Sequence, residues 1–423
     1  MNHQNNSHRR TSKLKFEQIY VIWGLWLFLF AALLGTSMRL FWVIDLPFFE
    51  YTNVLHAHSH LAMLGWGFTV ICALFIFFLK GLVQKPKSYR LLLLINVLVC
   101  LVMTVAFVVD GYTVLSISLL TAHLLIAYRL GYLLLQDLKR LTYKTASLLG
   151  RWAIYWMFIS TLGVWFLPVV IAKFGKFDPL YFASIELFLH LQFNGWFVFA
   201  ILAFLVLTLE QKRFILKITK FEFWMLQISL VLTYGLPAFW SYPIPVLSHL
   251  NALGVVVQLL VLGKLLYPLL KSWKVFQRDE VTIGDGLIVI GVVSLLIKTI
   301  IQFTLILPSF LGASSEVRQF FIGFIHLIML GVFTMTCLGV CVRNGIIPQV
   351  KLSKLGLQIL ILGFISTELI LFTQGLLLWN VVGAIPYYHE VILIFTIFLP
   401  VGIALVIASI YSTSSKKAAN ILS

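Results

Sequence analysis

Long apolar runs, separated by short polar or proline-rich linkers, make up almost the whole chain. A run of about 20 apolar residues is long enough to cross the hydrocarbon core of a bilayer as a helix. Twelve runs qualify, so the pattern predicts twelve transmembrane helices. They fall near residues 17–42, 54–80, 91–110, 113–135, 152–173, 181–208, 222–240, 246–270, 284–309, 317–342, 353–377 and 387–411.

This pattern indicates an all-α, polytopic integral membrane protein. We expect one twelve-helix transmembrane domain over residues 16–412, with a polar N-terminal tail at 1–15 and a C-terminal tail at 413–423. The composition agrees, because 61% of the 423 residues are hydrophobic and only 11% are charged. A soluble domain carries about 25% charged residues, so a soluble enzyme, a disordered chain and a small disulfide scaffold are excluded.

The positive charge of the chain reports its topology. There are 31 Lys and Arg against 15 Asp and Glu, a net charge of +16. If the N-terminus is cytoplasmic, 26 of these 31 basic residues fall on the cytoplasmic side. The outer side then holds Arg39, Lys173, Lys176 and Arg318, and Lys298 lies within a span. This asymmetry follows the positive-inside rule and predicts that both termini are cytoplasmic.

The same charge distribution bears on location and partners. We expect a multi-pass protein of the cell inner (cytoplasmic) membrane whose basic loops contact anionic lipid head groups. The charge excess gives no case for a nucleic-acid partner. The four cysteines lie inside apolar runs, and their spacing matches neither a zinc nor an iron–sulfur site.

The histidines are the most informative residues. Two of the ten, His3 and His8, lie in the polar N-terminal tail. The other eight all lie on even-numbered predicted helices, and seven of them near the outer end: His56, His58, His60, His123, His190, His249, His326 and His389, of which His123 is the one nearer mid-span. Polar groups are costly within a bilayer and tend to be functional there.

Four of these histidines begin a shared motif, His-Leu-x-x-x-Gly. It occurs at His60–Gly65, His190–Gly195, His249–Gly254 and His326–Gly331. The glycine falls about 140° around the helix from the histidine. Its missing side chain lets either a flat cofactor or a neighbouring helix approach closely.

The second predicted helix carries three histidines in two directions. His56 and His60 are four residues apart and share one face. His58 points roughly the opposite way.

The histidines also recur along the chain. His60, His190 and His326 are each separated by four helices, as are His123, His249 and His389. The spacing favours three pseudo-repeats of four helices, with the even helices forming an inner layer.

An intramembrane cluster of this kind suggests metal chemistry. A single histidine is often only an interhelical hydrogen-bond partner. Eight on helices of one parity, without cysteine or carboxylate clusters, point instead to haem iron or copper, because neutral imidazole is the commonest metal ligand.

With these features the chain resembles the haem–copper oxidase subunit I superfamily. The resemblance rests on twelve helices with histidines near the outer ends of the second, sixth and tenth. Within the superfamily it is closer to the small NnrS-type haem and copper membrane proteins. The segment His58-Ser-His60-LAML-Gly65 is similar to their His-x-His-x-x-x-x-Gly opening, and the run from His326 to Gly345 is similar to a later segment.

The chain also departs from the superfamily pattern. Oxidases carry a histidine pair on the seventh helix and His-x-His on the tenth, whereas here the seventh has none and the tenth has only His326. Four residues after the sixth-helix histidine, many oxidases have Tyr, and nitric oxide reductases have Glu near it. This position is Asn194 here. The usual binuclear oxygen-reducing site is therefore not expected.

The resemblance implies a haem ligated from opposite sides by His326 and by His60 or His58. A second metal site, with copper as the candidate ion, would take His190 and His249 with His389 or His123. The expected function is respiratory electron transfer, or the chemistry or sensing of oxygen or nitric oxide. An enzymatic role would be that of a membrane oxidoreductase of the terminal oxidase or nitric oxide reductase type with an atypical site. An electron donor or other respiratory subunits would be its partners.

The alternative hypothesis is a His-lined transporter for protons or metal ions. Lys298 and Glu368 are ionisable residues well inside two predicted spans. They could form a structural ion pair, which lowers the cost of burying them, or belong to a proton path.

Overall fold

The computed structural model describes residues 16–211, 218–271 and 282–422. In this part of the chain, twelve helical spans are long and apolar enough to cross a membrane, and they match the twelve predicted runs. No strand occurs among these residues. The chain is therefore an all-helical, multi-pass membrane protein.

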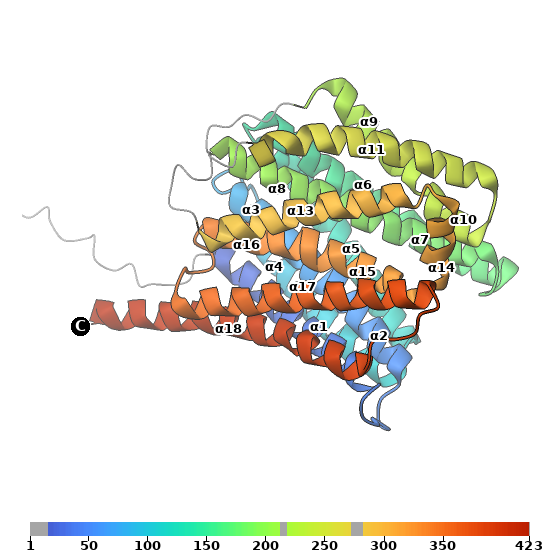
Figure 1. Cartoon of the computed structure of the whole chain (residues 1–423). Helices are drawn as coiled ribbons and strands as arrows, with labels where there is room; N and C mark the ends of the chain where they lie inside the picture. The colour runs from blue at the N-terminus through green and yellow to red at the C-terminus, as the bar shows by residue number, and fades with distance from the viewer. Residues whose placement is uncertain (1–15, 212–217, 272–281, 423) are drawn as a thin grey trace, which may run out of the picture.

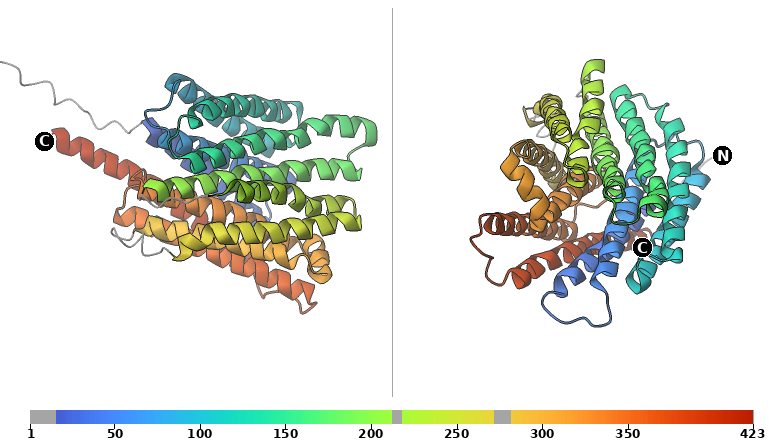
Figure 2. Two further views of the ribbon diagram at one scale, coloured as in Figure 1. Left: turned by 90° about the horizontal axis from the view of Figure 1, so that it is seen from above. Right: turned by 90° about the vertical axis from the view of Figure 1, so that its right-hand side faces the viewer.

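Eight of the spans are single α-helices: α1 (Phe16–Leu40), α4 (Pro86–Asp110), α5 (Val114–Leu138), α6 (Lys144–Phe174), α11 (Pro245–Lys271), α13 (Ile283–Thr304), α17 (Lys351–Trp379) and α18 (Tyr388–Leu422). A ninth consists of α9 (Lys220–Thr233) and α10 (Gly235–Ser241). The short helix α14 (Pro308–Glu316) links α13 to the tenth span. The helices run roughly along one axis (Figures 1 and 2).

The remaining three spans share an unusual construction. Each changes from an α-helix to a π-helix and back: α2 (Tyr51–His60), η1 (Leu61–Gly67) and α3 (Phe68–Phe78); α7 (Pro179–His190), η2 (Leu191–Phe197) and α8 (Val198–Gln211); α15 (Arg318–His326), η3 (Leu327–Met335) and α16 (Thr336–Arg343). Each π-helix begins directly after a motif histidine. Short π segments inside α-helices are rare and are frequent at functional sites.

These three composite spans are the core of the bundle. Of their most apolar stretches, 83%, 100% and 89% of the residues are buried, whereas the other nine spans range from 28% to 56%. The outer spans therefore expose much of their apolar surface, as a lipid environment requires.

The three π-helices meet at the centre of the bundle. Trp66 of η1 donates its indole Nε1–H to the Thr334 hydroxyl of η3 at 3.0 Å. The rings of Phe197 in η2 and Phe333 in η3 have centroids 4.9 Å apart. Gly67 lies against Phe197, since a Cβ atom on Gly67 would come within 2.7 Å of that ring. The three spans thus pack on one another without intervening helices.

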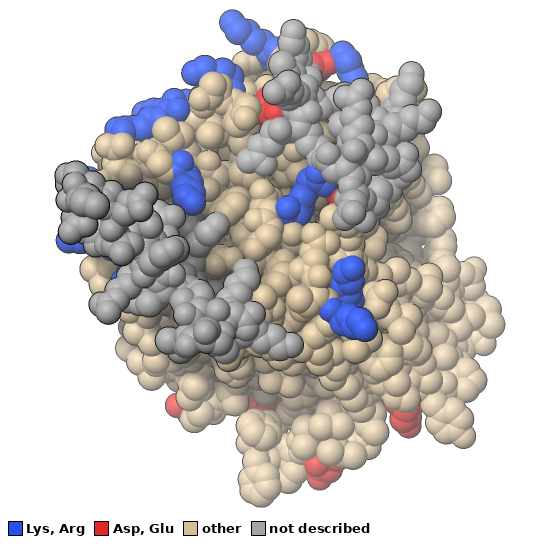
Figure 3. Space-filling model, turned by 90° about the vertical axis from the view of Figure 1, so that its left-hand side faces the viewer, with Lys and Arg blue, Asp and Glu red and all other residues tan. Residues whose placement is uncertain are grey.

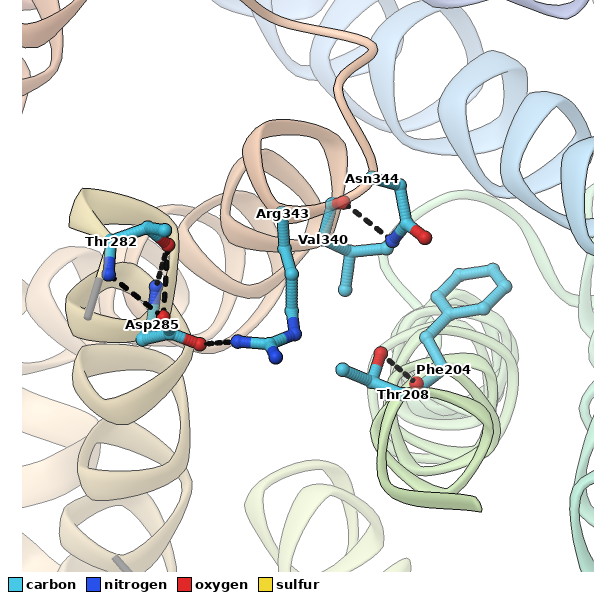
Figure 4. Close-up of polar contacts among 7 residues, drawn as sticks. All are labelled: Phe204, Thr208, Thr282, Asp285, Val340, Arg343 and Asn344. Atoms are coloured by element: carbon cyan, nitrogen blue, oxygen red, sulfur yellow. Dashed lines mark hydrogen bonds and ion pairs between the residues drawn. The ribbon is translucent and has the colours of Figure 1, made fainter. Parts of the chain in front are cut away.

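One end of the bundle is basic. The loops between α3 and α4, α5 and α6, and α16 and α17 all lie there, and Lys and Arg side chains are spread over this face (Figure 3). We call it the basic end. At this end Arg343 of α16 pairs with the buried Asp285 of α13, which also accepts hydrogen bonds from Thr282 (Figure 4).

Two features concern the ends of the chain. Helix α18 extends to Leu422 and so passes into the segment assigned to the C-terminal tail at 413–423. The tail at 1–15, with His3 and His8, lies outside the residues that the structure describes.

Candidate functional site

The three histidines of α2 point in two directions, as their spacing predicts. His58 faces α1, where its Nδ1–H donates to the Ala31 carbonyl oxygen at 2.8 Å. Its ring fits there because residue 35 is glycine, where a Cβ would come within 2.9 Å of the His58 ring. With Nδ1 donating, the lone pair of Nε2 faces away and is available to a ligand.

His56 and His60 lie on the other face, among aromatic side chains. The His60 ring stacks on Phe107 with centroids 4.7 Å apart, and His56 lies 4.7 Å from the ring of Tyr112. The His60 Nδ1–H donates to the His56 carbonyl oxygen at 2.7 Å. Burial raises the pKa of Tyr112 to about 12, so its hydroxyl stays protonated and donates to His60 Nε2 at 3.4 Å. Both ring nitrogens of His60 therefore have partners.

His326 of α15 lies on the His58 side of α2. It lies within electrostatic reach of His58 and of Arg39. Its Nδ1 is buried and has no hydrogen-bond partner. Of the two α2 histidines that the sequence left open, the structure brings His58 toward His326 and directs His60 into the aromatic cluster.

One guanidinium group, that of Arg39, lies within electrostatic reach of both histidines, and that of Arg318 lies beyond it, at the end of the bundle opposite the basic end. Arg39 hydrogen-bonds to the Tyr388 hydroxyl and is within electrostatic reach of Arg318. Arg318 donates to the Tyr51 hydroxyl at 3.5 Å. In the sequence, Arg39 and Arg318 were simply two of the few basic residues on the outer side.

The residue types of this set are ones that can hold a haem. Imidazoles from two helices are suitable axial ligands for haem iron. The buried Nδ1 of His326 has no hydrogen-bond partner, so no protein group competes with a ligand for that nitrogen. Guanidinium groups bind carboxylates strongly, and Arg39 and Arg318 would meet the propionates. We call His58, His326, Arg39 and Arg318 the α2–α15 site.

The histidines expected at a second metal centre are not grouped. His123 bonds to Asn96 at 2.8 Å, and His389 stacks on Trp42 with centroids 5.3 Å apart. His190 donates through Nε2 to the Leu230 carbonyl oxygen at 2.9 Å, and His249 is exposed. Over residues 16–211, 218–271 and 282–422, no three His, Cys, Asp or Glu side chains could hold a metal ion together. The second centre and its copper stay a prediction.

Lys298 and Glu368 are both buried, but they do not bond to each other. Neither the ammonium of Lys298 nor the carboxyl of Glu368 has a hydrogen-bond partner. Lys298 instead lies within electrostatic reach of His190.

Three of the four motif glycines serve helix packing. A Cβ on Gly195 would come within 2.6 Å of Trp156 in α6, and one on Gly331 within 2.6 Å of Ser294 in α13. Gly254 lies against Leu232 of α9. At Gly65 a Cβ would meet Leu61 of the same π-helix at 2.8 Å first, and Leu27 of α1 only at an ordinary contact distance of 3.6 Å. For Gly195, Gly254 and Gly331 the close neighbour is in the preceding span. Of the two roles open to these glycines, the structure assigns the close approach of a helix.

A cavity of about 250 Å³ lies beside His190. It is lined by residues of α7, η2, α9, α10, α13, α14, α15, η3 and α17. Seven of the lining side chains are aromatic, among them Phe193, Phe320 and Phe372. We call it the α14 cavity. The sequence did not predict this cavity. The one nearby signal was Lys298, an ionisable residue inside a span, which lies one helical turn from the lining residue Gln302.

Comparison with known proteins adds no relative. No protein-family model matches the chain, and no curated protein matches it. The assignment of function therefore rests on the residues of the site.

Proposed function

We propose that this chain is a haem-binding integral membrane protein, related to haem–copper oxidase subunit I, that acts in electron transfer or in the chemistry of a diatomic gas. The observation that carries the proposal is the α2–α15 site. It places two histidines from central spans within electrostatic reach, one of them with an unpartnered buried ring nitrogen.

Each residue of this site has a defined task. The Ala31 carbonyl fixes the His58 tautomer, so that Nε2 is the ligating atom. His326 would supply the opposite ligand, and Arg39 with Arg318 would neutralise the propionates. When bound, the haem supplies one-electron transfer.

The proposal includes three four-helix repeats and a cytoplasmic basic end. The repeats are supported by the three π-helices, which follow His60, His190 and His326 at intervals of four spans. The orientation is supported by the Lys and Arg side chains of the basic end (Figure 3). It puts the α2–α15 site in the outer half of an inner membrane, where an electron donor or a gas reaches it from outside.

Replacement of the ligands tests the haem assignment. We expect the purified protein to show a Soret band of six-coordinate haem. His58→Ala and His326→Ala should each lose the six-coordinate spectrum, since one axial ligand is missing. His60→Ala is the matched control, because this ring lies two residues from His58 on the opposite face. It should keep the spectrum.

Two results would contradict the assignment. Retention of the six-coordinate spectrum in His58→Ala, with its loss in His60→Ala, would move the ligand to His60. A purified protein without a Soret band or bound metal, which carries protons or metal ions across liposomes, would favour a transporter. This second candidate is supported by Lys298 and Glu368, which are buried ionisable groups without hydrogen-bond partners.

A further inference from the structure

The α14 cavity is large, and its walls are mainly aromatic. Its volume of about 250 Å³ exceeds the roughly 150 Å³ of an engineered apolar cavity that binds benzene. Aromatic walls favour stacked or edge-to-face contacts with another ring. A single substituted ring with a short apolar tail therefore fits its size and its walls.

The cavity reaches the outer surface of the bundle. Two of its lining residues, Phe321 and Leu376, are exposed by 37% and 48%. Both are apolar: Phe321 lies near the start of α15, at the end of a core span, and Leu376 lies in α17, which faces the lipid. An apolar molecule can therefore enter from the membrane without crossing a polar rim.

At the buried wall, the cavity presents acceptors that lack donors. Asn194 is 6% exposed, and its Oδ1 has no hydrogen-bond partner. Its Nδ2 is already engaged, at 3.2 Å from the His190 carbonyl oxygen and 3.4 Å from His190 Nδ1. Because His190 donates through Nε2 to Leu230, its Nδ1 accepts, which fixes the direction of the Asn194 amide.

Gln302 of α13 also has a free amide oxygen. It is 5% exposed, and its Oε1 has no hydrogen-bond partner. An unsatisfied buried polar group costs about 1–3 kcal/mol, so two on one cavity wall indicate that something else satisfies them. Water could donate to these oxygens, but it would leave the apolar aromatic walls hydrated, which is unfavourable.

We infer that the α14 cavity binds a phenol-class ligand, whose ring packs against the aromatic walls and whose hydroxyl donates to Asn194 Oδ1 or Gln302 Oε1. A hydroxyl suits this wall, because Asn194 Oδ1 and Gln302 Oε1 need a donor. The indole Nε1–H of Trp240, which also lines the cavity without a hydrogen-bond partner, can donate to a hydroxyl oxygen. This inference is independent of the haem assignment, since the cavity includes no residue of the α2–α15 site.

A matched pair of probes tests the hydroxyl. The full-length protein in detergent is titrated calorimetrically with 4-pentylphenol and with 4-pentylanisole, which has the same ring and tail but no O–H. We expect the phenol to bind at least fivefold tighter, as one neutral hydrogen bond of about 1 kcal/mol gives. Equal affinities for the two probes would overturn the inference.

Variants then locate the site. Asn194→Leu combined with Gln302→Met removes both acceptors and should abolish the preference for the phenol. Ala313→Trp fills the cavity and should abolish the binding of both probes. Gln258→Leu is the matched control, because it removes a buried, unpartnered amide outside the cavity and should keep the preference.

These variants also distinguish misfolding from a wrong site. A thermal melt shows whether each variant is folded, and each single substitution replaces the double variant if that one unfolds. Two results would overturn the inference: a preference for the phenol that survives the loss of both acceptors, and probe binding that survives in folded Ala313→Trp.

Discussion

At the scale of single residues, the packing at the centre of the bundle depends on a glycine, which has no side chain. Gly67 leaves the space that the Phe197 ring occupies, and this ring in turn packs on Phe333. Widening of η3 is supported locally, because the Thr334 hydroxyl donates to the Met329 carbonyl oxygen, five residues back, at 2.7 Å. The π-helices are thus fixed by contacts of individual residues.

Gly67→Ala tests this packing. Its Cβ would lie 2.7 Å from Cε1 of the buried Phe197 ring, and the rigid ring cannot move freely. Overpacking of this kind costs about 1–3 kcal/mol. We expect a lower midpoint of thermal unfolding in detergent.

The matched control is Gly263→Ala. Gly263 lies in helix α11, and a Cβ there meets nothing within 4 Å. Alanine stabilises a helix interior by about 1 kcal/mol relative to glycine. This variant should be unchanged or slightly more stable. Equal loss of stability in both variants would refute the packing argument.

At the scale of helices, the twelve spans are of two kinds. The three composite spans are buried on nearly all sides, and the single helices cover them and face lipid. Span α13 is joined to the core at its middle and at its basic end. Its Ser294 lies against Gly331, and its Asp285 pairs with Arg343 of α16 (Figure 4).

The Asp285–Arg343 ion pair predicts a strong asymmetry between variants. Arg343→Met leaves the fully buried Asp285 carboxylate without its cation, which costs about 3–5 kcal/mol when a buried pair is broken. The double variant with Asp285→Asn should recover much of this loss, because the charge is gone and the amide oxygen still accepts from Thr282. Unfolding midpoints in detergent measure both effects.

This expectation is contradicted if the effects of the two substitutions on stability simply add. If the double variant is less stable than Arg343→Met by the full effect of Asp285→Asn alone, the two charges do not interact. The ion pair would then contribute nothing to the contact between α13 and α16.

At the scale of the whole molecule, the two ends of the bundle differ in charge. The basic end exposes Lys80, Lys139, Arg140 and Lys351, and the α14 cavity lies toward the opposite end. This polarity predicts one orientation in the membrane, with the basic end in the cytoplasm.

Cysteine labelling tests the orientation directly. The four native cysteines are all buried and should not react with a membrane-impermeant maleimide. Phe177→Cys lies between α6 and α7, where Phe177 is 94% exposed, and should label in intact cells. Thr142→Cys, at an exposed position of the α5–α6 loop at the basic end, should label only after permeabilisation. The reverse pattern would invert the topology.

The sequence by itself determined the spans and the opposite faces of His58 and His60. Hydrophobic length, charge and helical periodicity are local properties, so they can be read residue by residue. The parity of the histidine-bearing helices followed from the same count. The sequence could not say which of His58 and His60 faces α1 and which faces the aromatic cluster, because this depends on the rotation of α2 against its neighbours.

Only the tertiary structure decided the rest. It separated His123, His190, His249 and His389 from one another, kept Lys298 and Glu368 apart, and revealed the π-helices and the α14 cavity. Each of these features is made by side chains from spans far apart in the sequence. Their contacts arise from how the spans pack against one another. The apolar pattern places each span in the membrane but is compatible with many different packings, so it cannot predict these contacts.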